Sequence, residues 1–298
     1  MRQFAGLLVF SVFMSACAKK PEIADYLHIG HAYDWHFTDR MDRRLEKLNF
    51  KSYDQIWLGG DVCARTSEKQ ATMQYLDSLL NFSKVHWSLG NHDNDYGELT
   101  NITNYLQRPT FYTQWQAGFC LMVLNTNLFW PYPGVPPQDD CEQKAEQLAM
   151  IQAVCDTIQA ASHLVILHHH ALFTEKMLDE KGDTIRTFNV NPVPFMASCD
   201  SSLTVTDFMY PRLVELEQKG IHVVLIGGDF GMRSKQFEYT SAEGITLLGS
   251  GVNNTVSREY APEYVTDFSA DYILELQYNF LEQQLSWQFK PLGELQSF

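Results

Sequence analysis

The 298-residue sequence has few basic residues for its length. Its 22 lysines and arginines stand against 36 aspartates and glutamates, so the formal net charge at pH 7 is −14. Non-specific binding to nucleic acid or to anionic lipid is therefore disfavoured, because both are polyanions. A phosphorylated substrate would also be repelled at long range, unless bound cations reverse the sign of the charge locally.

Paired cysteine motifs and long apolar segments are also absent. No Cys-x-x-Cys occurs, which disfavours a thiolate zinc site and a thiol oxidoreductase. After residue 17 no segment is apolar for long enough to predict a transmembrane helix. Five cysteines follow Cys17, an odd number that cannot all pair within one chain, and the sequence assigns no pairing among them.

The chain does have enough apolar sequence to bury a large core. It is 45% hydrophobic and 13% aromatic, which excludes a disordered or low-complexity protein. It contains neither internal repeats nor a clear linker between domains. We therefore expect one domain over residues 18–298.

The N-terminus has the features of an export signal. Arg2 precedes an apolar run, Phe4–Met14, that is too short to span a bilayer as a stable helix. The small residues Ser15 and Ala16 follow it, and then Cys17. This resembles the bacterial lipoprotein signal (residues 1–17), which ends at a lipidated cysteine. We expect a cell-envelope lipoprotein, on the periplasmic side or in the outer membrane, that touches the membrane only through its anchor; the alternative is an ordinary cleaved signal peptide.

Two short apolar runs end in glycine followed by polar residues. Gln55–Leu58 leads into Gly59-Gly60-Asp61, and Val85–Leu89 leads into Gly90-Asn91-His92-Asp93. A glycine after a strand lets the backbone turn sharply and approach a ligand closely. The next residues then lie at the carboxyl end of a sheet, where α/β folds place their chemistry. A mixture of carboxylate, carboxamide and imidazole donors suits divalent ions such as Mn, Fe or Zn.

The same pattern of strand, polar residues and helix continues along the chain and predicts an α/β fold. Helical spacing predicts helices at 39–48, after a capping box at Ser67–Gln70, at 142–160 and from Pro211 to Lys219. Residues 171–206 show little periodicity and are expected to form an irregular insertion. Further strands are expected at Tyr26–Ile29, Phe119–Leu124, His163–Leu167, Val223–Ile226 and Ile245–Leu248, with a terminal hairpin within Tyr272–Phe289.

These motifs in this order resemble those of the calcineurin-like metallophosphoesterases. Gly-Gly-Asp, then Gly-Asn-His-Asp, then a strand ending in consecutive histidines follow that family's order, and the similarity covers most of the chain after the signal. The resemblance implies a four-layer αββα sandwich with two mixed sheets. It also implies a site for one or two divalent metal ions.

The resemblance assigns roles to residues of this chain. Asp61 would bridge two metals, and Asn91 would bind the second through its side-chain oxygen. One of His168, His169 and His170 would bind it as well, with His169 favoured. His92 would face the phosphoryl group as general acid or charge stabiliser, and Asp93 would orient its ring.

Two motifs depart from the family pattern. Where the family has Asp-x-His, this chain has His31-Ala32-Tyr33, and where it has Gly-His-x-His, this chain has Gly228-Asp229-Phe230-Gly231. Asp229 then completes the ligands of the second metal, while the first keeps Asp61 and His31. Zinc-like ions normally take three or four protein donors, so the first metal is in question.

The resemblance implies metal-dependent hydrolysis of a phosphoester, on a phosphorylated small molecule or a phosphodiester. The two altered motifs support an alternative, a catalytically degenerate metal-binding lipoprotein that acts as a binding or structural module. The sequence does not name the substrate.

Overall fold

The computed structural model describes residues 22–34, 36–129, 138–185, 195–199, 203–230, 236–252, 259 and 271–294. The expected signal 1–17 with Cys17, parts of the expected insertion 171–206, and Gly231 lie outside these residues. None of the helices in the described ranges has the length and apolar character needed to span a bilayer.

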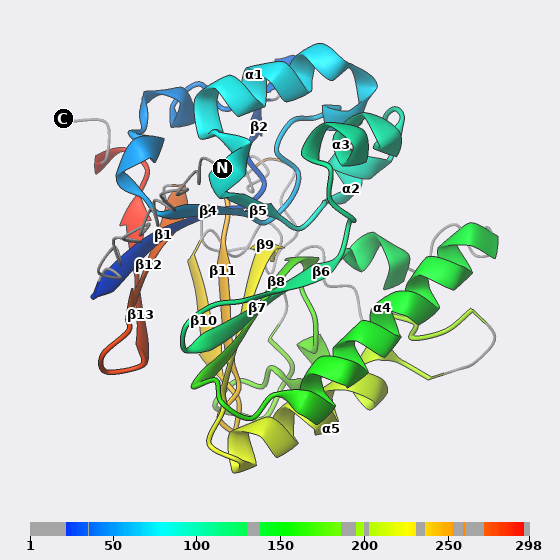
Figure 1. The fold of residues 1–298 in the computed structure, drawn as a ribbon, viewed down its shortest axis with the longest axis vertical. Coiled ribbons are helices and arrows are strands. Elements are labelled where there is room, and N and C mark those ends of the chain that lie inside the picture. The colour runs from blue at the N-terminus through cyan, green and yellow to red at the C-terminus, as the bar shows by residue number, and fades with distance from the viewer. Residues whose placement is uncertain are drawn as a thin grey trace, which may run out of the picture.

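Two mixed β-sheets lie at the centre of the fold (Figure 1). The first contains, in spatial order, β13 (Gln284–Pro291), β12 (Tyr272–Asn279), β1 (Ile23–Ile29), β4 (Gln55–Leu58) and β5 (Val85–Trp87). In this sheet β1, β4 and β5 are parallel, and the hairpin β12–β13 pairs antiparallel with β1. The hairpin expected near the C-terminus is thus present.

The second sheet is built around four parallel strands with an antiparallel strand at each edge. In spatial order it contains β10 (Gln236–Thr240), β11 (Thr246–Ser250), β9 (His222–Asp229), β8 (His163–His170), β7 (Phe119–Val123) and β6 (Tyr112–Trp115). The edge strands β10 and β6 are the antiparallel ones. A separate small hairpin pairs β2 (Tyr33–Asp34) with β3 (Phe37–Met41).

Helices cover the outer face of each sheet (Figure 1). The first sheet is covered by α1 (Gln70–Leu80) and α3 (Leu99–Leu106), and the second by α4 (Gln138–Thr157) and α5 (Val205–Gln218). The short helix α2 (Asn91–Asn94) follows β5 directly. Single 3-10 turns occupy Leu45–Lys47, Phe50–Ser52, Thr66–Glu68, Phe82–Lys84, Thr126–Phe129 and Thr174–Lys176.

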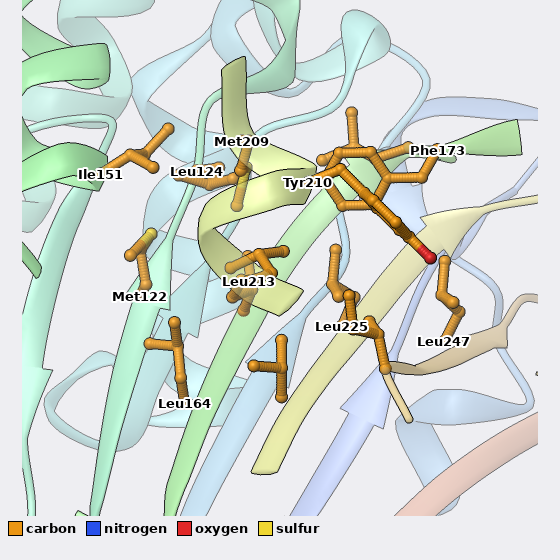
Figure 2. Packing of buried hydrophobic residues seen from close by; sticks show 14 of the residues in the cluster. Met122, Leu124, Ile151, Leu164, Phe173, Met209, Tyr210, Leu213, Leu225 and Leu247 are labelled. Carbon is orange, nitrogen blue, oxygen red and sulfur yellow. The ribbon is translucent and has the colours of Figure 1, made fainter. Parts of the chain in front are cut away.

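Three apolar clusters hold the four layers together. One lies between the sheets and includes Trp57, Phe119 and Leu167, all completely buried. Another packs α4 and α5 onto the second sheet; Figure 2 shows Leu213 of α5 close to the strand residue Leu225. Burial of a large aliphatic side chain contributes about 1.5–3 kcal/mol, so these clusters supply the main driving force for stacking the layers.

The sheets approach most closely at the edge where their parallel strands end. A Cβ atom on Gly228 would lie 1.8 Å from the backbone oxygen of Gly59, and one on Gly30 would lie 2.3 Å from the Cα of Gly228. Only glycine permits such an approach, and it brings the carboxyl ends of β1, β4 and β9 together.

Three local predictions are wrong. Residues 39–48 form the end of β3 and one 3-10 turn, because the chain there pairs as a hairpin and buries Met41 and Leu45 as separate contacts. No capping box precedes α1, since residues 66–68 form their own turn and Lys69 is the N-cap. Helix α5 begins at Val205 rather than at Pro211, because Thr204 and Asp207 form a capping box.

Candidate metal centre

Each polar residue singled out in the sequence follows or ends a strand at this shared edge. His31 follows β1, Asp61 follows β4, and Asn91 and His92 lie on α2 after β5. His169 and Asp229 belong to the last residues of β8 and β9, both of which extend further than expected. The parallel strands point the same way, so these side chains come from the same end of the two sheets.

The backbone at His31 and Asp61 is held in an unusual conformation. His31 has φ +48° and Asp61 has φ +53°, both in the left-handed region. Two hydrogen bonds join the segments: His31 N donates to Gly60 O at 3.0 Å, and Ala32 N donates to Asp61 O at 2.8 Å. Such conformations cost about 1–3 kcal/mol each, and the surrounding structure must hold them in place.

The carboxylate of Asp61 lies at the centre of the candidate site. Its Oδ1 is 3.5 Å from His169 Nε2 and accepts a hydrogen bond of 2.9 Å from the backbone N of His92. Its Oδ2 is 3.8 Å from His31 Nε2. Asp229 Oδ2 lies 4.0 Å from His169 Nε2. Asp61 is 1% exposed and His169 is completely buried, so neither side chain is solvated.

His169 has the geometry of a metal ligand. Its Nδ1 lies 2.6 Å from the carbonyl oxygen of Gly59, so Nδ1–H is the donor and Nε2 keeps a free lone pair. That buried Nε2 has no hydrogen-bond partner, which is also true of the Nε2 atoms of His28 and His168. What marks His169 is that carboxylate oxygens of Asp61 and Asp229 lie 3.5 Å and 4.0 Å from this nitrogen. Donors about 2.1 Å from one tetrahedral ion would be about 3.4 Å apart, close to the 3.5 Å between His169 Nε2 and Asp61 Oδ1.

The donors around Asp61 are pairs rather than a finished cage. No three His, Cys, Asp or Glu side chains in the described ranges are already grouped closely enough to hold an ion. The 4.0 Å between His169 Nε2 and Asp229 Oδ2 would have to shorten by a few tenths of an ångström. Because the donor types and the orphaned Nε2 agree, we conclude that His169, Asp61 and Asp229 fit a divalent cation.

The electrostatics of the site agree with cation binding. Burial raises the pKa of Asp61, and His31 and His92 only partly oppose this. Burial likewise lowers the pKa of His169, which keeps its imidazole neutral. A divalent cation would favour both the ionised carboxylate and the neutral imidazole, which are the forms that bind metal.

Asn91 is the first residue of α2 and is half-buried. The preceding Gly90 is pressed against the site, because a Cβ there would lie 2.1 Å from Asp61 Oδ1 and 2.7 Å from His169 Cε1. Asn91 thus begins its helix beside the two ligand candidates. Ligation by its side chain stays a prediction.

His92 is more exposed than Asp61 and His169. Its Nδ1 is 3.1 Å from Ala64 O, which leaves Nε2 as the nitrogen that can reach a ligand. The ring is half-buried, with its centroid 4.7 Å from that of Tyr33 and 5.4 Å from that of Tyr96. Nε2 of His92 is therefore the ring nitrogen available to a bound molecule, while the backbone N of His92 supports Asp61.

The hydrogen bonds of Asp93 go to groups other than the His92 ring, whose Nδ1 lies 3.1 Å from Ala64 O. The role expected for Asp93 in the reaction stays a prediction. Asp93 is completely buried and accepts hydrogen bonds from the backbone N–H groups of Asp61 (2.8 Å), Val62 (3.1 Å) and Gly90 (2.9 Å). The Thr66 hydroxyl and the Trp87 indole N–H also donate to it. These hydrogen bonds connect the Asp61 loop to the Gly90 loop.

Of the three consecutive histidines, the structure brings His169 to Asp61. His168 Nδ1 bonds to His170 O at 2.9 Å, and His170 Nδ1 pairs with Thr126 Oγ1 at 2.8 Å. Side chains alternate between the two faces of β8. His169 shares with Leu167 the face toward the other sheet, while His168 and His170 share with Ile166 the face toward the helices. The choice of His169 agrees with this placement.

Two further features, the packing of Tyr33 and a disulfide, were not predicted from the sequence. Tyr33 is 2% exposed and lies between the rings of His31 and His92. Its departure from the family motif was the one signal of this position in the sequence. A disulfide joins Cys141 of α4 to Cys199, 58 residues later. Spacing alone gave no signal for that pair.

The chain matches a known protein family over most of the described core. The family model of the calcineurin-like phosphoesterases matches residues 27–227 of the chain. The chain therefore belongs to the calcineurin-like phosphoesterase family. This confirms the predicted fold, a mixed α/β sandwich of the metallophosphoesterase type, and the family uses divalent metals.

Curated relatives match only part of the chain. A symmetrical bis(5'-nucleosyl)-tetraphosphatase of Shewanella frigidimarina is 31% identical over 134 residues, 39% of this chain and 48% of the relative. That of Vibrio campbellii is 43% identical over 56 residues, 18% of this chain and 20% of the relative. The chain thus spans about half or less of these relatives' length.

A solved structure shows the same fold at low sequence identity. GAP50, described as the anchor in the inner membrane complex of Plasmodium, aligns with a TM-score of 0.56. The alignment covers 92% of this chain and 86% of GAP50, at 9% identity. It supports the fold only.

Proposed function

We propose that this protein hydrolyses a phosphoester of a small molecule or a phosphodiester in a metal-dependent reaction. The observation that carries the proposal is the buried, unpartnered Nε2 of His169, which faces the carboxylates of Asp61 and Asp229. The tetraphosphatase relatives support this class of substrate. Asp61, His169, Asp229 and Asn91 would hold the cation, which when bound acts as a Lewis acid on the phosphoryl group.

Residues of the chain supply proton donation and hold the Asp61 carboxylate in place. His92, through Nε2, donates a hydrogen bond or a proton to the phosphoryl oxygens or the leaving group. Asp93 and the His92 backbone N–H keep the Asp61 carboxylate in place. Because the chain carries a net charge of −14, an anionic substrate needs the cation and His92 to offset the repulsion.

The test is a panel of phosphomonoesters, phosphodiesters and a dinucleoside tetraphosphate, with added Mn²⁺. In His92→Ala we expect turnover to fall about 10²–10⁴-fold while metal content is unchanged, because a positioned acid contributes that much. Asp61→Ala should instead empty the site. The control is His36→Ala, since the His36 side chain is 87% exposed. Loss of metal in His92→Ala, or no turnover of any substrate while metal stays bound, would contradict the proposal.

The second candidate function is a non-catalytic binding or structural module that keeps a metal. The placement of Tyr33 between His31 and His92 favours it, since an aromatic ring stands where another donor is expected. The same panel separates the two candidates, because the module binds metal and turns over nothing.

We also propose that the chain is exported and anchored through Cys17. The N-terminal sequence supports this, and so does the Cys141–Cys199 disulfide, because disulfides persist in oxidising compartments. In cell fractionation the protein should follow the membrane, and Cys17→Ser should move it to the soluble envelope fraction. Recovery of the wild-type chain in the cytoplasm would refute this proposal.

A further inference from the structure

The two oxygens of the Asp61 carboxylate face different surroundings. Oδ1 faces His169 Nε2 at 3.5 Å, and Asp229 Oδ2 lies 4.0 Å from the same nitrogen. Oδ2 faces His31 Nε2 at 3.8 Å. A carboxylate arranged in this way could bridge two ions only if each side offered enough donors.

The His169 side offers three charged or imidazole donors. Asp61, His169 and Asp229 all come from loops or strand ends that are fixed by backbone hydrogen bonds. Ala171 N donates to Asp229 O at 3.2 Å, and His169 is oriented by Gly59 O. Three protein donors are the number that a catalytic zinc-type ion takes.

Among the described residues, the His31 side offers one carboxylate, that of Asp61, and one imidazole, that of His31. His31 Nδ1 lies 3.3 Å from Val252 O, and its Nε2 therefore points to Asp61. The neighbouring space is occupied by the ring of Tyr33, whose centroid is 4.7 Å from those of both His31 and His92. Two donors are fewer than a structural or catalytic ion of this type uses.

Tyr33 is fixed in that place by the fold. It is 2% exposed, pairs with Met41 in the β2–β3 hairpin, and follows Ala32, whose N–H bonds to Asp61 O. Its ring is tilted against the imidazoles of His31 and His92, with a centroid distance of 4.7 Å to each, and its backbone is held by the hairpin. We propose that the chain binds a single divalent cation on the His169 side of Asp61, and that Tyr33 fills the place of a second ion. This rests on the metal site of the proposed function.

The experiment counts ions in the purified chain after equilibrium dialysis against Mn²⁺ or Zn²⁺, by elemental analysis. The wild type should carry one ion per chain. Tyr33→His puts an imidazole beside His31, so this variant should carry two, the second with lower affinity. Tyr33→Phe is the matched control, because it keeps the ring and removes the hydroxyl; it should still carry one.

The outcomes separate this inference from the proposed function. Two ions in the wild type, or loss of the ion in Tyr33→Phe, would overturn the inference and leave the metal site of the proposed function intact. No ion in the wild type would overturn both. A folded Tyr33→His chain that stays at one ion would also overturn it, with folding checked by circular dichroism and a thermal melt.

Discussion

At the scale of single residues, Asp93 joins two loops that are far apart in sequence. Its carboxylate accepts from three backbone N–H groups, one hydroxyl and one indole, all within a buried environment. Asp61 has a left-handed backbone, and its own N–H and that of Val62 both donate to Asp93. The stability of the candidate site is therefore concentrated in a residue that need not touch substrate.

We expect Asp93→Asn to lower the free energy of unfolding by about 1–3 kcal/mol, because an amide has one acceptor oxygen and leaves buried N–H groups unpaired. Chemical denaturation measures this. Asp95→Asn is the matched control, since Asp95 is exposed on the turn that follows α2. Equal effects of the two substitutions would show that Asp93 does not hold the loops together.

Gly90 allows the second prediction at this scale. A methyl group at this position would press on Asp61 Oδ1 and on the backbone N of Asp61 at 2.5 Å. Gly90→Ala should therefore displace the carboxylate and weaken metal binding about 10–100-fold, the range seen when the support of a ligand is removed. Gly293→Ala should leave the affinity unchanged, because nothing lies within 4 Å of a Cβ there. Calorimetric titration with Mn²⁺ compares the two, and undiminished affinity in Gly90→Ala would exclude Asp61 as a ligand.

At the scale of elements, the Cys141–Cys199 disulfide joins the first turns of α4 to the segment before α5. That segment packs on the site's border: Met196 N donates to Phe129 O at 3.1 Å, and the Phe195 ring lies 5.9 Å from that of His170. The disulfide therefore holds part of the expected insertion against the end of β8.

Reduction of this disulfide should destabilise the protein by about 2–4 kcal/mol, because it closes a long loop in the unfolded chain. A thermal melt with and without reductant measures the loss. The double variant Cys141→Ser/Cys199→Ser should melt at the lower temperature and ignore the reductant. The other cysteines in the described ranges are free and buried: Cys63, Cys120 and Cys155. A reductant effect that persists in the double variant would therefore show that the loss of stability does not come from the Cys141–Cys199 disulfide.

The elements that carry the site were the most predictable ones. Val85–Trp87 and Gln55–Leu58 are short apolar strands, and the glycines after them mark the turns, so the sequence alone predicts where Asp61 and His92 lie. Parallel pairing then brings these ends together. Each motif is therefore predicted from the strand before it and the glycine turn that follows that strand.

Contacts between distant segments could not be predicted in this way. The partners of Asp93 come from two segments, 61–66 and 87–90. Tyr33 reaches the site through a hairpin too short to show a period, and the disulfide spans 58 residues. Residues 39–48 show helical spacing, yet pairing with β2 overrides it. Each failure arises because tertiary pairing, not local preference, decides the structure there.

At the scale of the whole molecule, burial keeps several histidines neutral. Desolvation lowers the pKa of His28 to about 3 and those of His86, His163 and His168 to about 4, each with a further repulsive contribution from a neighbouring cation or imidazole. In the unfolded chain these groups titrate near 6.5. Between these pH values the unfolded chain binds more protons than the folded one. The stability that these neutral histidines contribute is therefore fully present above pH 6.5 and is lost as pH falls toward 4.

His86 is suited to a test because it lies on β5, away from Asp61 and His169. Its Nδ1 is 3.0 Å from the Tyr112 hydroxyl, a contact that glutamine could keep. Between pH 7.5 and pH 5 the wild type should lose roughly 2 kcal/mol through His86 alone, and His86→Gln should lose less by about that amount. Denaturation midpoints at both pH values measure the difference. His36→Gln, an exposed control, should follow the wild type. An equal loss of stability between the two pH values in all three chains would show that His86 is not held neutral by burial.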